Sequence, residues 1–363
     1  MLEHALKVIE EISSHGFKAY LVGGFVRDYI LNIQSSDIDI TTNATPQNIR
    51  EMFQEECLPG EDYGSVTVVK RGIRYEITTF RKEIGYADHR KPVEIKYIDD
   101  LYQDLLRRDF TINAICMNQN GEIIDYLGGQ RDIHNKKITS IGDASMKFEE
   151  DALRILRAIR FAAVLGFQLD EEVVHAIHKH KGLLKELSYY RKKSELDKMF
   201  GSSHVEDAID LLLKFGLDKE LELSNLEKVH HTNSLIGVWS ILNVTEKYPF
   251  TNNEKELIQS INEVLPLNNL DPMALYKYGL YVNSVAAEIK EVDIKDVTES
   301  YNNLVIKSRS DLEITSDEIM ELLDREPGSY LTEVYQDIEK EVLYRRLEND
   351  KDSLSRYIVE HYK

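Results

Sequence analysis

The stretch from Leu21 to Thr42 limits what this chain can fold into more than any other part of it. The residues 20–22 have the composition of a buried strand, and Gly23 and Gly24 follow directly. Glycine permits a sharp turn that brings backbone N–H groups close to a bound molecule. A short apolar helix pattern comes next, so the stretch predicts a strand, a glycine turn, a helix and a second strand.

The second strand of this unit carries Asp37 and Asp39. Because residues i and i+2 of a strand point to one face, both carboxylates should converge, while Ile38 and Ile40 point into the core. An Asp-x-Asp pair alone is typical of ordinary turns. Next to a glycine turn, however, the pair offers hard oxygen ligands for Mg²⁺ and N–H groups for phosphate, as a nucleoside triphosphate requires.

Two alternating apolar stretches, 65–69 and 75–80, flank a turn at Arg71 and Gly72 and predict a β-hairpin. Glu76 lies on its second strand, where a third carboxylate of the metal site would be expected. A solvent-facing glutamate is an equally good interpretation of this residue. The following residues 81–95 have no clean periodicity and are interpreted as a mobile basic loop.

A polar cluster, Arg107, Arg108 and Asp109 with Asn113, precedes an apolar run. By itself this pattern is typical of a helix N-cap at Asp109 beside surface arginines.

A charged ladder marks the helical part of the chain that begins near Phe148. Four residues recur at steps of three: Asp151, Arg154, Arg157 and Arg160. On one helix they would form a slanting row about 13 Å long, comparable to a nucleoside triphosphate. A solvated charged face is the usual alternative, but acidic residues at i±4 are sparse, which favours triphosphate binding.

The first pair of the ladder has the chemistry of a base-recognition edge. Asp151 accepts hydrogen bonds only, and Arg154 donates only. Cytosine and adenine both present an amine beside a bare ring nitrogen, which this pair matches. Uracil and guanine present the reverse pattern and would leave polar groups unpaired, so the pair would select C and A and reject U and G.

Together these motifs resemble those of the class II bacterial tRNA nucleotidyltransferases, the CCA-adding enzymes, in the superfamily of DNA polymerase beta. The segments that carry the resemblance are Gly-Gly-Phe-Val-Arg-Asp, Asp37-Ile-Asp39, Arg107-Arg-Asp-Phe-Thr-Ile-Asn-Ala, Asp125-Tyr-Leu-Gly-Gly and Glu150-Asp-Ala-Leu-Arg. The resemblance implies an α+β, seahorse-like architecture. Its expected parts are an α/β catalytic head over 1–140 and an all-helical neck over 141–203, body over 204–270 and tail over 271–363.

The resemblance also implies roles for individual residues. Asp37 and Asp39 would be catalytic metal ligands, with Glu76 as the third catalytic carboxylate. The nucleotide-binding residues would be Gly23, Gly24, Arg27, Arg108, Asp109, Asn113, Asp151, Arg154, Arg157 and Arg160. The family's fifth motif is represented by Ser188, Arg191, Glu195 and Lys198, but Tyr190 stands where an acidic residue is expected. We therefore predict a structural role for that helix.

The expected reaction is template-independent addition of CCA to the 3′ end of tRNA from CTP and ATP. The tRNA 3′-hydroxyl would attack the α-phosphate in line, two Mg²⁺ ions would assist, and pyrophosphate would leave. The tail would hold the tRNA elbow.

Three alternatives remain open within and beyond the family. An A-adding specialist that works with a separate CC-adding enzyme is the nearest, whereas a CC-only enzyme would lack the loop around 88–92. A poly(A) polymerase is disfavoured by the pI of about 5.1 and by the sequence Gly-Ser-Val-Thr-Val from Gly64. A non-catalytic RNA-binding protein is disfavoured because both aspartates and the glycine turn are present.

Composition limits the class of protein and its cellular location. A net charge of −19 argues against a protein that coats nucleic acid non-specifically. No apolar run reaches membrane-spanning length, residues 1–12 contain no signal segment, and Cys57 and Cys116 suggest neither a disulfide framework nor a metal site. We expect a cytoplasmic protein without membrane contact, either a monomer or a homodimer.

Overall fold

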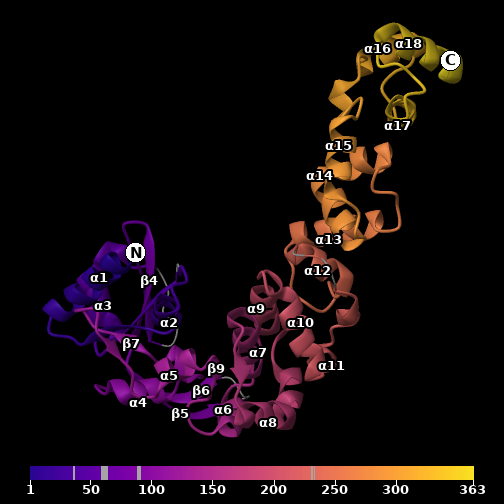
Figure 1. Ribbon diagram of the computed structural model, residues 1–363. Helices are drawn as coiled ribbons and strands as arrows, with labels where there is room; N and C mark the ends of the chain where they lie inside the picture. The colour runs from indigo at the N-terminus through magenta and orange to yellow at the C-terminus, as the bar shows by residue number, and fades with distance from the viewer. Residues whose placement is uncertain (36, 59–63, 88–90, 230–231, 233) are drawn as a thin grey trace. The chain divides into compact units, whose positions relative to one another are not determined.

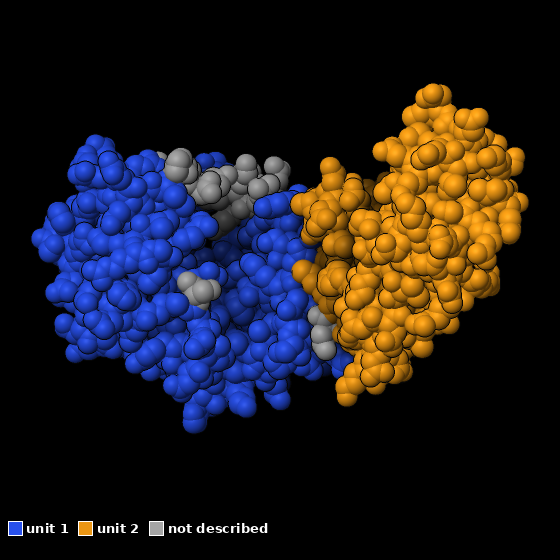
Figure 2. Space-filling view, turned by 90° about the horizontal axis from the view of Figure 1, so that it is seen from above, with its two compact units in different colours: residues 1–223 blue, residues 224–363 orange. Residues whose placement is uncertain are grey.

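The computed structural model describes residues 1–35, 37–58, 64–87, 91–229, 232 and 234–363. The chain forms two compact units, Met1–Leu223 and Ser224–Lys363 (Figure 2). The division into four domains from the sequence stays a prediction.

The first unit contains a six-stranded mixed sheet in the order β3-β4-β2-β1-β7-β8. Helices α1 and α3 pack on this sheet (Figure 1). The strands of the sheet are β1 (Ala19–Val22), β2 (Ile38–Thr42), β3 (Ser65–Lys70), β4 (Ile73–Thr79), β7 (Cys116–Met117) and β8 (Ile123–Ile124). The short strands β9 (Lys137–Ile138) and β10 (Gln168–Leu169) form a separate parallel pair.

The register of the sheet brings the predicted motifs together. Val22 on β1 lies opposite Asp39 on β2, and Asp39 lies beside Glu76 on β4. The buried side chains of Ile38 and Ile40 confirm the predicted core face of β2. Asp37 directly precedes this strand. The predicted hairpin is also confirmed, because β3 and β4 pair antiparallel around a turn at residues 71–72.

The interpretation of residues 81–95 as an irregular loop was wrong. Strands β5 (Arg81–Ala87) and β6 (Lys91–Tyr97) pair antiparallel in a two-stranded ribbon of their own. Such a ribbon does not belong to the main sheet and has little apolar surface to bury, so its sequence lacks the alternation that marks a half-buried strand. Residues 88–90 lie outside the described residues, so the expectation that the loop around 88–92 distinguishes this chain from a CC-only enzyme stays a prediction.

The helices of the first unit begin at recognisable signals. Thr45 forms a capping box with Asn48, and Pro46 stands at the first position of α3. The helices are α1 (Leu2–Ser14), α2 (Gly24–Ile30), α3 (Pro46–Phe53), α4 (Leu101–Leu106), α5 (Gly129–His134), α6 (Ala144–Glu150), α7 (Leu153–Leu165), α8 (Glu171–His180), α9 (Tyr189–Phe200), α10 (Val205–Lys214) and α11 (Leu217–Leu221).

The charged ladder is not carried by a single helix, contrary to the expectation. Helix α6 ends at Glu150 and α7 begins at Leu153, so Asp151 lies in the junction with an extended backbone. Its Oδ1 accepts a hydrogen bond from the Leu153 N–H at 3.0 Å. The Asp151 carboxylate thus satisfies a backbone N–H group at the start of α7. Because a short polar side chain can bond the backbone in this way, it offers the chain an alternative to a continuous helix.

The second unit is helical throughout its described part. Its elements are α12 (Leu235–Leu242), α13 (Asn252–Val264), α14 (Pro272–Ile289), α15 (Ile294–Asn302), α16 (Ser316–Leu323), α17 (Tyr330–Leu343) and α18 (Lys351–Tyr362). Trp239 is buried against Tyr248 and Phe250, as expected for a core residue. A sheet-containing first part followed by helices confirms the α+β class. Among the described residues, no helix combines the length and apolar character needed to cross a membrane.

Candidate active site

A cleft of about 1160 Å³ opens in the first unit, and every residue predicted from the sequence to belong to the site lines it. These are Gly23, Gly24, Arg27, Asp37, Asp39, Glu76, Arg108, Asp109, Asn113, Asp151, Arg154, Arg157 and Arg160. They come from the glycine turn and α2, from β2 and the residue before it, from β4, from the segment after α4, and from α7 and the junction before it. These segments are distant in sequence. The fold therefore gathers the predicted residues in one place, while the role of each stays a prediction.

The glycine turn lies directly against the acidic part of the cleft. Gly23 has φ of 79° and ψ of −139°, a conformation that side chains rarely permit. A Cβ atom at this position would lie 3.1 Å from Oδ2 of Asp39 and 3.6 Å from Nη1 of Arg108. Both the backbone angle and this close approach therefore require glycine.

The carboxylates Asp37, Asp39 and Glu76 make no hydrogen bond or ion pair with other described residues. Burial raises the pKa of Asp39 to about 6; Arg108 opposes the shift, and the Glu76 and Asp37 carboxylates add to it. A bound cation would relieve this unfavourable gathering of negative charge.

These carboxylates fit a divalent cation that shares its ligands with substrate. In the described part of the chain, no group of three or more His, Cys, Asp or Glu side chains is placed to hold a metal ion. Magnesium-type sites are commonly built from one or two carboxylates, with phosphate oxygens and water completing the shell. Asp37 and Asp39 suit that arrangement. The role of Glu76 as a third ligand stays a prediction.

A buried hydrogen-bond network connects α2 to α7. Arg27 donates to Oδ1 of Asp28 from Nε at 2.9 Å and to Oδ1 of Asn113 from Nη1 at 2.7 Å. Asn113 donates from Nδ2 to Oδ1 of Asp109 at 3.1 Å, and Arg157 donates from Nε to Oδ2 of Asp109 at 2.6 Å. Burial by itself would raise the pKa of Asp109, but Arg157 and the hydrogen bonds outweigh burial and hold it at about 2.

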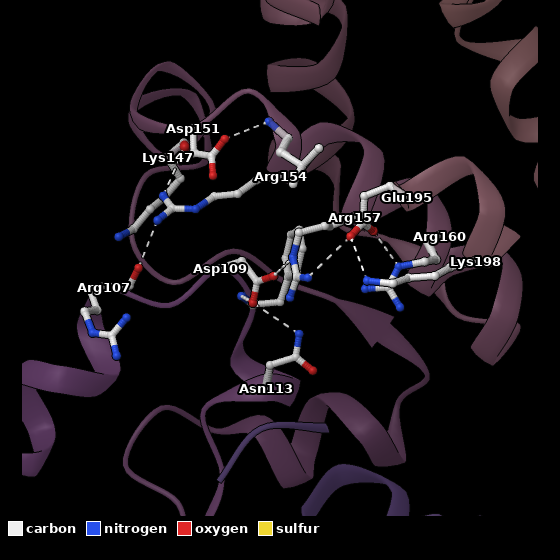
Figure 3. Close-up of polar contacts among 12 residues, drawn as sticks. Arg107, Asp109, Asn113, Lys147, Asp151, Arg154, Arg157, Arg160, Glu195 and Lys198 are labelled. Carbon is white, nitrogen blue, oxygen red and sulfur yellow. Dashed lines mark hydrogen bonds and ion pairs between the residues drawn. The ribbon is translucent and has the colours of Figure 1, made fainter. Parts of the chain in front are cut away.

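The arginines of α7 already have acidic partners, which corrects the expectation that neutralising groups are sparse (Figure 3). Arg160 donates from Nε to Oε2 of Glu195 at 2.7 Å, and Arg157 lies 3.8 Å from Oε1 of the same carboxylate. Sequence spacing within one helix could not reveal Glu195, because it comes from α9. The Arg160 guanidinium also lies over the Phe161 ring, 4.2 Å from its centroid.

Arg154 is held by the main chain on two sides. Its Nη2 donates to the Arg107 carbonyl at 2.9 Å, and its Nη1 donates to the Lys147 carbonyl at 3.1 Å and to Glu150 Oε2 at 2.7 Å (Figure 3). These contacts fix the guanidinium in the cleft wall, and a rigid position is what a base-recognition group needs.

Asp151 forms an ion pair with Arg191 of the fifth motif. Nη2 of Arg191 donates to its Oδ2 at 2.8 Å, while Nη1 of Arg191 is buried and has no hydrogen-bond partner among the described residues. The helix that carries this motif thus lines the cleft through Arg191 and Lys198 and pairs with the α7 arginines through Glu195.

Asp104 is a structural centre of the site that the sequence analysis missed. It is fully buried and accepts hydrogen bonds from Thr41 Oγ1 at 3.0 Å, from the Arg81 N–H at 3.1 Å and from Arg107 Nε at 2.8 Å. It thereby connects β2, β5 and the residues after α4. A single aspartate in a helical stretch gives no sequence signal for this role, because its partners are up to 63 residues away.

The segment Asp125-Tyr-Leu-Gly-Gly supports the site through helix α5. Asp125 accepts hydrogen bonds from the Gly129 and Gln130 N–H groups at 2.9 and 2.8 Å, at the start of α5. A Cβ atom on Gly129 would lie 2.4 Å from the Thr111 carbonyl oxygen. Only glycine allows α5 to approach the short 3₁₀ turn Thr111–Asn113, which carries Asn113 into the cleft.

A mixed sheet that sets carboxylates beside a glycine turn, in a cleft walled by arginines, is the arrangement expected of a nucleotidyltransferase. The comparisons with known proteins agree. The sequence matches the poly A polymerase head domain over residues 19–139, the RNA and SrmB binding site of polymerase A over 166–224, and tRNA nucleotidyltransferase domain 2 over 240–358.

Relatives that match over nearly the whole chain identify the family within this class. The chain is 34% identical to the CCA-adding enzyme of Bacillus pumilus, covering 98% of this chain and 96% of that protein. It is also 34% identical to the CCA-adding enzyme of Bacillus subtilis, over 98% and 97% of the two chains. This protein belongs to the CCA-adding enzyme family.

Solved structures of similar fold agree with this assignment. The Bacillus stearothermophilus CCA-adding enzyme, solved in complex with CTP, has a TM-score of 0.86 at 27% identity, covering 98% of this chain and 96% of that one. The Thermotoga maritima CCA-adding enzyme, complexed with tRNA, shares the fold with a TM-score of 0.70 at 20% identity. Use of a divalent metal follows from membership of this nucleotidyltransferase family.

Proposed function

We propose that this protein adds C, C and A in turn to the 3′ end of tRNA, using CTP, ATP and Mg²⁺. The observation that carries the proposal is the register that sets Asp39 opposite Val22 and beside Glu76, next to the Gly23 turn. This arrangement supports a site in which acidic groups for nucleotidyl transfer would lie beside the glycine turn and the Arg108 guanidinium. We also propose that the protein acts in the cytoplasm and that its C-terminal helices hold the tRNA elbow.

In the proposed reaction, the 3′-hydroxyl of the tRNA loses its proton to solvent, and its oxygen forms a bond to the α-phosphorus of the incoming nucleotide. The bond from that phosphorus to the β-phosphate oxygen breaks, and pyrophosphate leaves with the electron pair. Magnesium, when held by Asp37 and Asp39, supplies Lewis-acid chemistry that lowers the pKa of the hydroxyl and neutralises the phosphates. Arg108 lies next to Gly23. If the pyrophosphate departs toward this turn, the Arg108 guanidinium would neutralise its negative charge.

Base selection is assigned to Asp151 and Arg154. A carboxylate has more acceptor positions than the Leu153 N–H and Arg191 use, so an exocyclic amine can still donate to Asp151. Arg154 is held rigidly by carbonyl groups of two segments. A fixed acceptor beside a fixed donor suits cytosine and adenine and leaves polar groups unpaired with uracil and guanine.

The deciding experiment measures incorporation of each labelled nucleotide into three tRNA transcripts, lacking the last three nucleotides, ending in CC, and ending in CCA. Full CCA addition predicts that the shortest tRNA gains C, C and A and that extension then stops. Extension of the CC-ended tRNA alone, by ATP alone, would identify an A-adding specialist. Unlimited addition of A would identify a poly(A) polymerase.

Aspartate variants separate catalysis from RNA binding. Asp37→Ala and Asp39→Ala should abolish incorporation and leave tRNA binding intact. A wild-type protein that binds tRNA but incorporates nothing would refute the enzymatic proposal and favour a non-catalytic RNA-binding role.

A further inference from the structure

We propose that Arg74 binds a backbone phosphate at the 3′ end of the acceptor RNA. This inference rests on the proposed nucleotidyl transfer and adds to it a protein group that positions the attacking strand. Neither the motifs nor the ladder analysed above includes Arg74.

The register of the sheet places Arg74 on β4, which lies on the far side of Asp39 from the glycine turn. Arg74 and Glu76 are two residues apart on β4, and both side chains line the cleft. Strand β2, with Asp39, lies between β4 and β1, which leads into Gly23. Two strand spacings, about 10 Å, therefore separate β4 from the glycine turn.

Charge pairing distinguishes Arg74 from the other cations of the cleft. Arg27 pairs with Asp28, Arg157 with Asp109, and Arg160 with Glu195. On the same hairpin, Lys70 pairs with Glu11 and Glu56 at 2.7 and 3.2 Å.

The Arg74 side chain, in contrast, is exposed and forms no hydrogen bond or ion pair within the described residues. It leaves a positive charge available beside the acidic centre.

The geometry of in-line displacement identifies the anion that this charge suits. The attacking oxygen and the leaving oxygen lie on opposite sides of the α-phosphorus. If pyrophosphate leaves toward Gly23 and Arg108, the RNA end must approach from the opposite side, along β4. A guanidinium binds a phosphodiester through paired N–H groups, and Arg74 would hold the RNA end near the carboxylates in this way.

The first test compares Arg74→Ala and Arg74→Lys with Arg71→Ala. Arg71 is an exposed arginine at the tip of the same hairpin and does not line the cleft, so its variant controls for the loss of one positive charge. Arg74→Ala should raise the KM for tRNA about tenfold, the effect of one charged hydrogen bond. Arg74→Lys should recover part of the loss, Arg71→Ala should match wild type, and the KM for CTP should stay unchanged in all three.

The second test uses acceptor RNAs in which one of the terminal phosphates is replaced by a neutral methylphosphonate. If Arg74 binds that phosphate, Arg74→Ala does not raise the KM further for the RNA that carries the methylphosphonate at that position. For RNAs neutralised at any other position, Arg74→Ala raises the KM by its full factor. Three results would overturn the proposal. Arg74→Ala could leave the KM for tRNA unchanged, or it could raise the KM for CTP instead. The effects of the variant and of the methylphosphonate on the KM for tRNA could also be additive at every linkage.

A binding measurement without nucleotide keeps this inference separate from the proposed function. Arg74→Ala should reduce the slope of log Kd for tRNA against log salt by about 0.7, the share of one phosphate of a single strand. An inactive wild-type protein would refute the proposed function alone. An unchanged slope in an active enzyme would refute the role of Arg74 alone.

Discussion

Gly23 and Asp39 lie so close together that a side-chain carbon on Gly23 would be 3.1 Å from the Asp39 Oδ2 atom. The turn and the carboxylate therefore fix each other's position. We predict that Gly23→Ala lowers kcat about tenfold, because the added methyl group strains the backbone and pushes the carboxylate away by a few tenths of an ångström. Steady-state incorporation of CMP into tRNA measures it.

Gly72→Ala is the matched control for this variant. Gly72 has a similar φ of 76°, but a Cβ atom there would meet nothing within 4 Å. We expect Gly72→Ala to cost about 1 kcal/mol of stability through backbone strain and to keep wild-type kcat. Equal losses of activity in both variants would show that strain alone, and not displacement of Asp39, explains the effect.

Asp104 should contribute more to stability than any surface aspartate. Removing its carboxylate leaves the Arg107 guanidinium, the Thr41 hydroxyl and a backbone N–H without their buried acceptor. We predict that Asp104→Ala lowers the free energy of unfolding by about 3 kcal/mol or more. Urea unfolding measures the loss, and faster hydrogen exchange in β2 and α4 should accompany it.

Asp99→Ala provides the comparison for Asp104. Asp99 is exposed and pairs with Lys18 at 3.1 Å. Exposed ion pairs contribute little, so this variant should unfold close to wild type. A similar loss in the two variants would contradict the role assigned to the Asp104 carboxylate.

Local sequence patterns predicted the parts of the site whose partners are near in the chain. The Gly23 turn and the core face of β2 follow from glycine conformation and strand alternation. The residues predicted for the site all line one cleft, and their roles stay predictions. The resemblance to a family brought them together because it adds spatial information that periodicity lacks.

The missing parts depend on contacts between distant segments. Asp104 is paired with Thr41 and Arg81, and Glu195 with Arg160, and neither pairing leaves a local pattern. The β5–β6 ribbon was missed for a different reason, since strands outside the main sheet need no apolar alternation. The break at Asp151 was missed because helical periodicity continues across it in the sequence.

Asp151→Asn tests the base-recognition edge. A carboxylate only accepts hydrogen bonds, whereas an amide of the same shape also donates and can meet the uracil carbonyl. We predict that the ratio of kcat/KM for CTP to that for UTP falls at least tenfold, and that the ratio for ATP to GTP falls with it. Competition assays with all four nucleotides measure both ratios, while the KM for tRNA should stay unchanged. Discrimination that stays at the wild-type level would exclude Asp151 from base recognition.

The Asp109–Arg157 pair predicts a specific loss of stability in acid. The pKa of Asp109 is about 2 in the folded protein and about 3.9 in an unfolded chain, so the unfolded state takes up the proton first as the pH falls. The carboxylate therefore stabilises the fold fully above about pH 5 and loses this contribution between about pH 4 and pH 2, an amount on the order of 2 kcal/mol. Asp109→Asn removes the titrating group. Urea unfolding should show wild type more stable than this variant at pH 6, with the difference shrinking at pH 3, whereas a difference independent of pH would mean that Arg157 does not depend on the ionised form of Asp109.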